Sequence, residues 1–167
     1  SCTLGSINVA RCLTTHRGTS SIDYERLGNL IPVMVRFLDN VLHRTHFPLA
    51  SIEARTKRTR KIGLGIMGFA DLLIQLDIPY DSDDALHIAD QLMGFVRRQA
   101  HEASHRLAQE RGPFPAHKGS PLEAEGPPRR NATVTTIAPT GTISILADCS
   151  AGIEPLYGVS VAHTIME

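Results

Sequence analysis

Three short stretches of the sequence combine residue types and spacings that could support chemistry. Residues 63–68 read GLGIMG, the G-x-G-x-x-G spacing of dinucleotide-binding turns. Residues 101–105 read HEASH, which on a helix places two histidines on one face, as a zinc ion requires, with a glutamate beside them as a base. Residues 139–144 read PTGTIS, where a glycine and hydroxyl side chains suit a bound phosphate. Each motif must be judged by the elements that would position it.

The surroundings of GLGIMG argue against dinucleotide binding. A dinucleotide turn follows a strand of about five residues, and a buried parallel strand is a nearly continuous apolar run. Here the preceding residues read RTKRTRKI, with one apolar side chain. An acidic residue ending a second strand is expected about 20 residues later, but that region reads PYDSDDA, a turn and a helix cap. We therefore predict that the glycines allow a strand and its helix to pack closely.

The flanks of HEASH likewise disfavour a zinc site. A metal site needs a dry shell that fixes its ligands, whereas polar and charged residues surround this motif, and only Glu123 or Glu125 offers a third ligand. The apolar stripe of the predicted helix runs through Ala100, Ala103 and Leu107, so the histidines flank it. We predict solvated surface histidines and no metal.

The stretch around PTGTIS is the strongest candidate for a binding site. Residues 133–138 read TVTTIA and predict a strand, while the apolar residues 143–147 form either a strand or a helix. If a helix begins here, a phosphate would meet converging backbone N–H groups at its positive end, those of Thr140, Gly141, Thr142, Ile143 and Ser144. Gly141 would let the backbone approach closely, and the hydroxyls would add donors. An ordinary tight loop between strands is the alternative, and spacing alone does not distinguish the two.

The composition is that of one ordinary globular domain. The chain has 167 residues, 42% hydrophobic and 20% charged, with 17 basic and 17 acidic side chains. This balance gives no reason to expect nucleic acid or an anionic membrane as a partner, and no apolar run reaches the roughly 20 residues that span a bilayer. Cys2, Cys12 and Cys149 form neither a disulfide framework nor a CxxC pair. Without a signal-peptide pattern, a reducing, cytoplasmic setting fits best.

Hydrophobic periodicity predicts a helix-rich α/β domain over residues 1–167, with short strands at 62–66 and 133–138. Helices are expected over 21–43, capped by Ser20 or Ser21 with Pro32 inside, from about residue 49 to a basic run at 55–61, and over 82–111, capped by Ser82 and ended by Gly112. Residues 113–130 form a proline-rich surface loop. The two or three visible strands are too few to close a barrel.

Read in order, these motifs resemble the large catalytic subunits of ribonucleotide reductases. Residues 130–157, RNATVTTIAPTGTISILADCSAGIEPLY, are similar to that family's substrate-phosphate loop. Residues 1–9, SCTLGSINV, resemble its Cys-x-Leu-Gly-Ser-Ile-Asn segment, and RKIGLGIMGFADLL resembles R-x-I-G-[LI]-G-V-x-G-x-A-D-x-L apart from Ile66. EASHRLAQERGPF resembles a helix end whose histidines bind no metal. The PTGTIS form is most similar to the adenosylcobalamin-dependent class II enzymes.

The resemblance implies a piece of the family's ten-stranded α/β barrel and roles for particular residues. Cys2 matches the reducing cysteine that gives the substrate an electron and a proton and then forms a disulfide, which an external dithiol or a thioredoxin-like reductant resets. Leu4 follows in the same strand and lines the substrate, and Thr140–Ser144 match the loop that holds the nucleotide phosphate. The implied reaction converts ribonucleotides to deoxyribonucleotides by radical chemistry, with adenosylcobalamin as cofactor of the parent enzyme.

The sequence also departs from the family. Its radical-bearing cysteine lies in an Asn-x-Cys-x-Glu motif upstream of the matching segments, and neither Cys12 nor Cys149 sits in such a motif. We therefore expect a partial barrel that is inactive alone, pairs with the remainder of the reductase chain, and self-associates through uncovered apolar strand faces. The alternative is a catalytically dead remnant that binds nucleotides or a partner chain.

Overall fold

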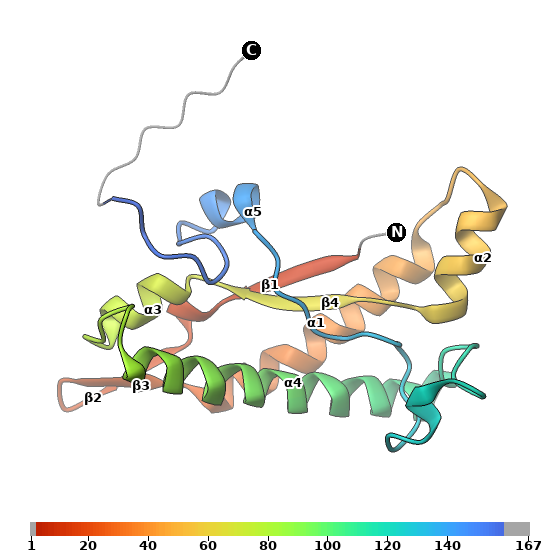
Figure 1. Cartoon of the computed structure of the whole chain (residues 1–167), viewed down its shortest axis with the longest axis horizontal. Helices are drawn as coiled ribbons and strands as arrows, with labels where there is room; N and C mark the ends of the chain where they lie inside the picture. The colour runs from red at the N-terminus through yellow and green to blue at the C-terminus, as the bar shows by residue number, and fades with distance from the viewer. Residues whose placement is uncertain (1–2, 159–167) are drawn as a thin grey trace, which may run out of the picture.

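Helices dominate the computed structural model, which describes residues 3–158, and its strands are short (Figure 1). The strands are β1 (Leu4–Asn8), β2 (Leu13–His16), β3 (Thr19–Ile22) and β4 (Gly63–Met67). The helices are α1 (Tyr24–Arg44), α2 (Ala50–Thr59), α3 (Phe69–Gln75), α4 (Asp83–Arg111) and α5 (Gly141–Leu146), with 3-10 turns at Val9–Arg11 and Pro121–Glu123. The predicted helix-rich α/β class is confirmed, and the described residues form no closed barrel.

β4 is the central strand of a small parallel sheet. β1 pairs with it in parallel over all five residues of each strand. On its other side, residues 133–136 run parallel to it through the Leu64–Thr135 bridge and a 3.1 Å hydrogen bond from the Ile62 N–H to the Thr133 carbonyl. Every residue of β4 is buried, as its central place requires. The strand predicted at 133–138 is confirmed only in part, because no regular ladder forms along it.

The glycines of GLGIMG have packing roles. A Cβ on Gly63 would lie 2.7 Å from Leu4 Cδ2, and one on Gly65 would lie 2.9 Å from the Thr136 carbonyl oxygen, so neighbouring chain occupies the space of a side chain. Gly68, with φ of +77°, is the residue from which α3 begins. The first two glycines therefore lie inside a strand, where there is no turn to hold a pyrophosphate. Close packing is thus observed as predicted, but Gly63 and Gly65 pack against the neighbouring segments at Leu4 and Thr136 and not against the helix that follows the strand.

A β-hairpin that the sequence did not predict precedes α1. β2 and β3 pair antiparallel around a two-residue turn at 17–18, whose φ angles are 51° and 83°. Because β3 contains both Ser20 and Ser21, neither caps the helix. Asp23 does so instead, accepting a hydrogen bond of 2.8 Å from the Arg26 N–H.

The other helix boundaries follow local signals in the sequence. Ser82 caps α4 by accepting a 3.2 Å hydrogen bond from the Ala85 N–H, and Gly112, with φ of +81°, ends it. Pro32 lies inside α1 without ending it. The short helix predicted from residue 49 is α2. The ends of α4 were predictable because Ser82 and Gly112 bond within a few residues of themselves, whereas Leu49 makes no side-chain cap bond at the start of α2.

α1 and α4 pack against each other; in the view of Figure 1, α4 lies below the sheet, α1 runs obliquely from near α4 past β4, and α5 stands above the sheet. The rings of Tyr24 and Phe95 join the two long helices, with centroids 4.9 Å apart in an edge-on arrangement. The core between these helices and β4 includes Leu27, Leu64 and Leu92, all fully buried. Within residues 3–158, no helix combines the length and apolar character needed to cross a membrane.

A buried ion cluster ties α1, α2 and α4 to the segment that leads into residues 133–136. Asp39 is fully buried, and its Oδ1 accepts hydrogen bonds from Arg60 Nε at 3.0 Å and Asn131 Nδ2 at 3.0 Å. Its Oδ2 lies 3.2 Å from Arg111 Nη1 and 3.5 Å from Arg130 Nε. One carboxylate thus faces three guanidinium groups that come from different parts of the chain.

Candidate functional site

The PTGTIS motif folds as a turn into α5, which decides the strand-or-helix alternative in favour of the helix. Thr140 is buried with φ of 55°, and its Oγ1 accepts a 2.6 Å hydrogen bond from the Gly152 N–H. The Ser144 hydroxyl donates to the Gly141 carbonyl at 2.9 Å, and the Ser144 N–H donates to the Thr140 carbonyl at 2.8 Å. The hydroxyls of Thr140 and Ser144 therefore hold the turn in shape.

Three backbone amides at the start of α5 are left open. Among the described residues, no acceptor bonds the N–H groups of Gly141, Thr142 or Ile143, and all three residues are exposed. No atom lies within 4 Å of the position a Cβ on Gly141 would take. Unpaired amides at the positive end of a helix attract an anion. Thr142 adds an exposed hydroxyl to the same edge.

The turn is held at the carboxyl ends of the parallel strands. Asn8, the last residue of β1, donates from Nδ2 to the Ala147 carbonyl at 3.3 Å. The Gly68 N–H donates to the Ser150 carbonyl at 2.8 Å, and the Ser150 N–H donates to Asp71 Oδ2 at 2.6 Å. Ligands of open parallel sheets bind at this end of the strands.

The other predicted site residues lie elsewhere. Cys2 falls outside the described residues. Leu4 is 48% exposed at the start of β1 and lines a cavity of about 250 Å³ beside Gly63, to which residues 140–144 do not contribute. The structure thus gathers Thr140–Ser144 into one turn but sets Leu4 at the other end of a strand about 13 Å long.

The sequence analysis missed the polar residues below α5. A cavity of about 780 Å³ includes Arg11, Asp71, Asp148 and Cys149 together with Ser144. Burial, followed by the charges of Asp71 and Asp148, raises the pKa of the Cys149 thiol despite the opposing charge of Arg11. A raised pKa favours the protonated thiol over the reactive thiolate. No local pattern marks this group, because its members come from separate elements.

The two histidines of HEASH face protein groups. His101 lies against the Arg129 guanidinium, at 3.2–3.3 Å from Nη1. The Nδ1 of His105 lies 2.9 Å from the Pro128 carbonyl, and its Nε2 lies 3.1 Å from Gln109 Nε2. In residues 3–158 no three His, Cys, Asp or Glu side chains gather as metal ligands would. The motif is half-buried against the proline-rich loop rather than fully solvated, which corrects the expectation of plain surface histidines.

The described residues form a piece of an α/β protein, in which parallel strands lead into helical turns. The open amides beyond the carboxyl ends of these strands make that edge a ligand-binding candidate. The chain belongs to the family "Ribonucleotide reductase, barrel domain", which matches residues 1–126 and 124–166. The resemblance read from the sequence is thereby confirmed, and the fold is a part of that family's barrel.

Individual relatives agree with the family assignment. The chain is 48% identical over 166 residues to a vitamin B12-dependent ribonucleoside-diphosphate reductase of Thermoplasma acidophilum, covering 99% of this chain and 21% of that protein. A protein of the same description from Mycobacterium tuberculosis is also 48% identical over 166 residues, with 99% and 23% covered. The class Id ribonucleotide reductase alpha subunit of Actinobacillus ureae superposes with a TM-score of 0.73 at 26% identity, covering 92% of this chain and 28% of that one. The chain thus spans about a fifth of the curated relatives it matches.

Proposed function

We propose that this chain is the part of a cobalamin-dependent ribonucleoside-diphosphate reductase that supplies the reducing thiol of Cys2 and the phosphate loop Thr140–Ser144. The observation that carries the proposal is the set of open amides at Gly141, Thr142 and Ile143, at the carboxyl ends of the strands. The relatives, which are ribonucleoside-diphosphate reductases, support the reaction and the diphosphate level of the substrate. The loop would hold the phosphates through the amides, and Leu4 would line the sugar.

The chemistry balances with two thiols. Replacing the ribose 2′-hydroxyl by hydrogen takes two electrons and two protons and releases water. Cys2 and a second cysteine of the parent enzyme lose those electrons and protons and join as a disulfide, and an external dithiol or a thioredoxin-like protein restores both thiols. Cys12, which is buried, and Cys149, whose thiol pKa is raised, are not suited to this role. The substrate must extend from the start of β1 to the loop, about 13 Å along the strand.

The described residues do not by themselves fit a corrinoid. The cavity beside α5 mixes the charged side chains of Arg11, Asp71 and Asp148 with apolar ones such as Ile74, Ile145 and Leu156, so it offers no uniformly apolar wall to the broad face of a corrin ring. In this proposal the adenosylcobalamin belongs to the parent enzyme, and the part played by this chain is limited to the thiol and the loop. A cytoplasmic enzyme is the natural setting, because reducing thiols must stay reduced.

The remainder of the reductase chain is the proposed partner. Apolar side chains are exposed on α1 and around α5, among them Val33, Phe37 and Leu146. Exposed apolar surface of this kind marks contacts, so the piece alone should self-associate, which light scattering would register. A catalytically dead remnant that binds nucleotides is the second candidate, and the open amides favour it equally.

Transplanting the chain tests the reductase proposal. If this chain replaces the matching segment of the Thermoplasma acidophilum relative, the folded chimaera should form deoxyribonucleoside diphosphate with adenosylcobalamin and a dithiol. The chain alone should form none, because the radical-bearing motif is absent from it. A folded but inactive chimaera would favour the remnant, and product from the chain alone would contradict the expected inactivity.

Blocking the open amides should remove nucleotide binding at the loop. Gly141→Trp places an indole over the N–H groups, and we expect the dissociation constant of ADP to rise by about tenfold or more. The readout is the ADP-dependent shift of the amide signals of residues 140–144 in a ¹⁵N-labelled sample. Gly141→Ala is the matched control, since its Cβ meets no atom within 4 Å and the fold should keep its stability. Equal affinity in wild type and Gly141→Trp would remove the loop from the site.

A further inference from the structure

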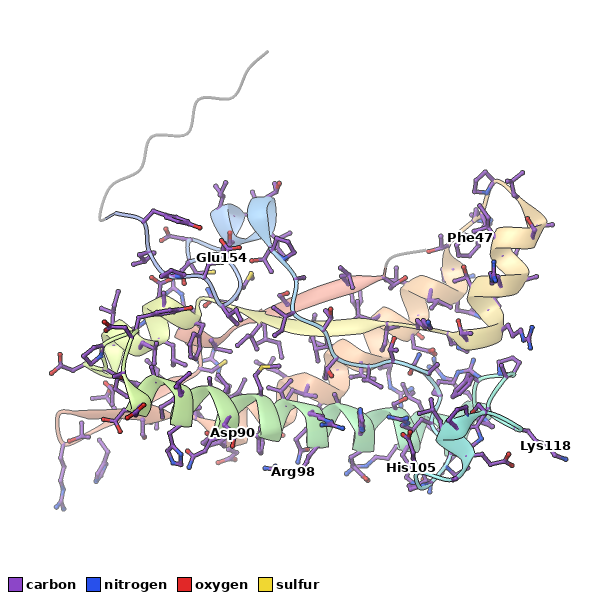
Figure 2. All side chains as sticks on the ribbon, in the orientation of Figure 1. Phe47, Asp90, Arg98, His105, Lys118 and Glu154 are labelled. Carbon is purple, nitrogen blue, oxygen red and sulfur yellow. The ribbon has the colours of Figure 1, made fainter. Side chains whose placement is uncertain are left out.

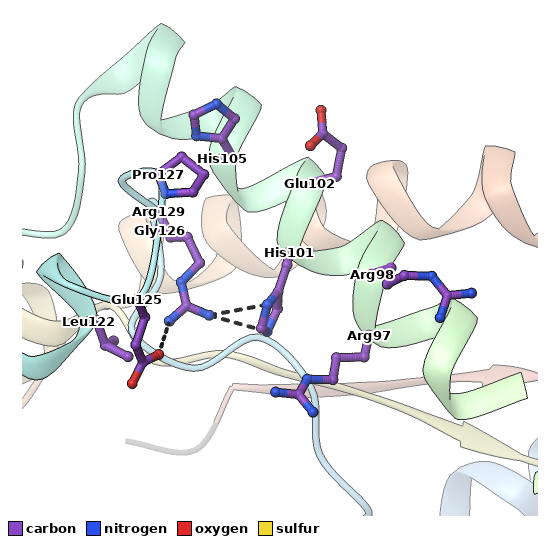
Figure 3. A pocket seen from close by; sticks show the side chains of 10 residues that line it. All are labelled: Arg97, Arg98, His101, Glu102, His105, Leu122, Glu125, Gly126, Pro127 and Arg129. Atoms are coloured by element: carbon purple, nitrogen blue, oxygen red, sulfur yellow. Dashed lines mark hydrogen bonds and ion pairs between the residues drawn. The ribbon is translucent and has the colours of Figure 1, made fainter. Parts of the chain in front are cut away.

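A second hollow lies between α4 and the proline-rich loop, and basic side chains line it. Its volume is about 370 Å³, within the range of small-molecule sites. Arg97, His101 and His105 follow at four-residue spacing on one face of α4, and Arg129 enters from the loop. Figure 3 shows Arg129 and His101 pointing toward each other, with Glu125 beside Arg129. None of these residues has a role in the proposed reductase function.

The contact between Arg129 and His101 joins a guanidinium donor to a ring that has at most one acceptor nitrogen. Arg129 Nη1 lies 3.3 Å from Nδ1 and 3.2 Å from Nε2 of the ring. In either neutral tautomer only one ring nitrogen can accept a hydrogen bond, so the guanidinium meets an N–H at the other. If His101 is protonated, both nitrogens become donors. No protonation state of His101 therefore lets both ring nitrogens accept a hydrogen bond from Arg129.

The positive charge of the hollow is only weakly compensated. The Arg129 side chain is 13% exposed, and its carboxylate partner is Glu125, 61% exposed and 3.8 Å away. Glu102 also lines the hollow, but its carboxylate pairs with Arg106 at 3.0 Å. Arg97 has no hydrogen-bond or ion-pair partner among the described residues. A half-buried cluster of positive charge attracts anions and raises their local concentration.

We propose that this hollow binds a diphosphate group, free or as part of a nucleotide, with Arg97, His101 and Arg129 as its donors. Guanidinium groups form charge-assisted and often bidentate hydrogen bonds with phosphate oxygens. A phosphate between Arg129 and His101 would accept hydrogen bonds from N–H groups of both side chains. The apolar wall formed by Leu122 and Pro127 offers contact area to a nucleoside.

Binding of the anion should be linked to protonation of His101. Burial, followed by the charges of Arg129 and Arg97, holds the pKa of His101 below its usual range, while Glu125 acts in the opposite direction. The charged or titratable groups that line the hollow with His101 are Arg97, Arg98, Glu102 and His105 on α4 and Glu125 and Arg129 on the loop. A bound diphosphate favours the imidazolium, so the pKa of His101 should rise on binding.

The test uses protein carrying Gly141→Trp, so that binding at the α5 turn does not contribute. Inorganic diphosphate and ADP are titrated separately by calorimetry, and the ring signals of His101 are followed by NMR as a function of pH. We expect Arg129→Gln to raise the dissociation constant by about tenfold and the exposed Arg97→Gln by about threefold or more. Lys118→Gln is the control, because it removes one positive charge at the outer tip of the same loop (Figure 2).

The outcomes separate the ligand sources. Equal affinities for diphosphate and ADP mean that the phosphates alone are recognised, whereas tighter ADP binding means that the wall of Leu122 and Pro127 holds the nucleoside. The proposal is overturned if neither ligand binds, if Arg97→Gln leaves the affinity unchanged in folded protein, or if the pKa of His101 does not move. If Gly141→Trp removes ligand binding at the α5 turn while the hollow still binds its ligand, this site does not depend on the proposed reductase function.

Discussion

Asp39→Asn is expected to lower the free energy of unfolding by about 3–5 kcal/mol, the cost of breaking a buried ion pair from one side. The variant leaves the guanidinium groups of Arg60, Arg111 and Arg130 facing a neutral amide. Arg60 is the most affected, because its side chain is only 4% exposed. Denaturant unfolding of the chain, followed by circular dichroism, measures the change.

Glu110→Gln is the matched control for this variant. Glu110 pairs with Arg36 at 2.7 Å, but both side chains are nearly half exposed, so water screens the pair. Its loss should cost less than about 1 kcal/mol. If Asp39→Asn and Glu110→Gln lowered the free energy of unfolding by similar amounts, the buried cluster would not stabilise the fold more than an exposed ion pair does.

The same cluster predicts a dependence of stability on pH. Burial by itself raises the pKa of Asp39. The hydrogen bond and charge of Arg60, helped by Asn131 and Arg130, lower that pKa by more than burial raises it, so it lies below its usual range. A carboxyl whose pKa is depressed in the folded state stabilises the fold above its unfolded pKa of about 3.9. That contribution is lost as the pH falls through the folded pKa. Wild type should therefore lose more stability than Asp39→Asn on acidification from about pH 5.

Cys2→Ser in the chimaera with the Thermoplasma acidophilum relative is expected to lower repeated turnover by on the order of 10³-fold or more, as removal of a reacting group does. A serine hydroxyl cannot be oxidised to a disulfide, so it cannot supply an electron to the ribose. The measurement is deoxyribonucleotide formation with excess dithiol. Binding of substrate should be nearly unchanged, because the proposed phosphate contacts come from the loop at the other end of β1.

Cys149→Ser is the control for the loss of a thiol. Cys149 is half-buried beside Gly68, and its raised thiol pKa keeps it protonated. Turnover should remain near that of the unmodified chimaera. If Cys149→Ser abolished turnover while Cys2→Ser did not, the assignment of the reducing thiol would be wrong.

Local signals were sufficient for most helix boundaries. Ser82 and Gly112 delimit α4 because a cap bonds to amides or carbonyls within one turn of itself. The same reasoning failed at the start of α1, where the pairing of β2 with β3 competes for Ser20 and Ser21. Arg17 and Gly18 both have positive φ, as a tight antiparallel turn requires, but in the sequence only Gly18 marks that turn.

By itself, the sequence determined the family, the helix-rich class and the stretch that carries the candidate phosphate loop. Only the tertiary structure decided that residues 141–146 are helical, that Thr140 is held by Gly152, and that His101 faces Arg129. It also assembled the cluster around Asp39, whose partner Asn131 lies 92 positions away. Caps and apolar periods act over a few neighbouring residues, whereas the partner of a buried charge depends on which elements pack together.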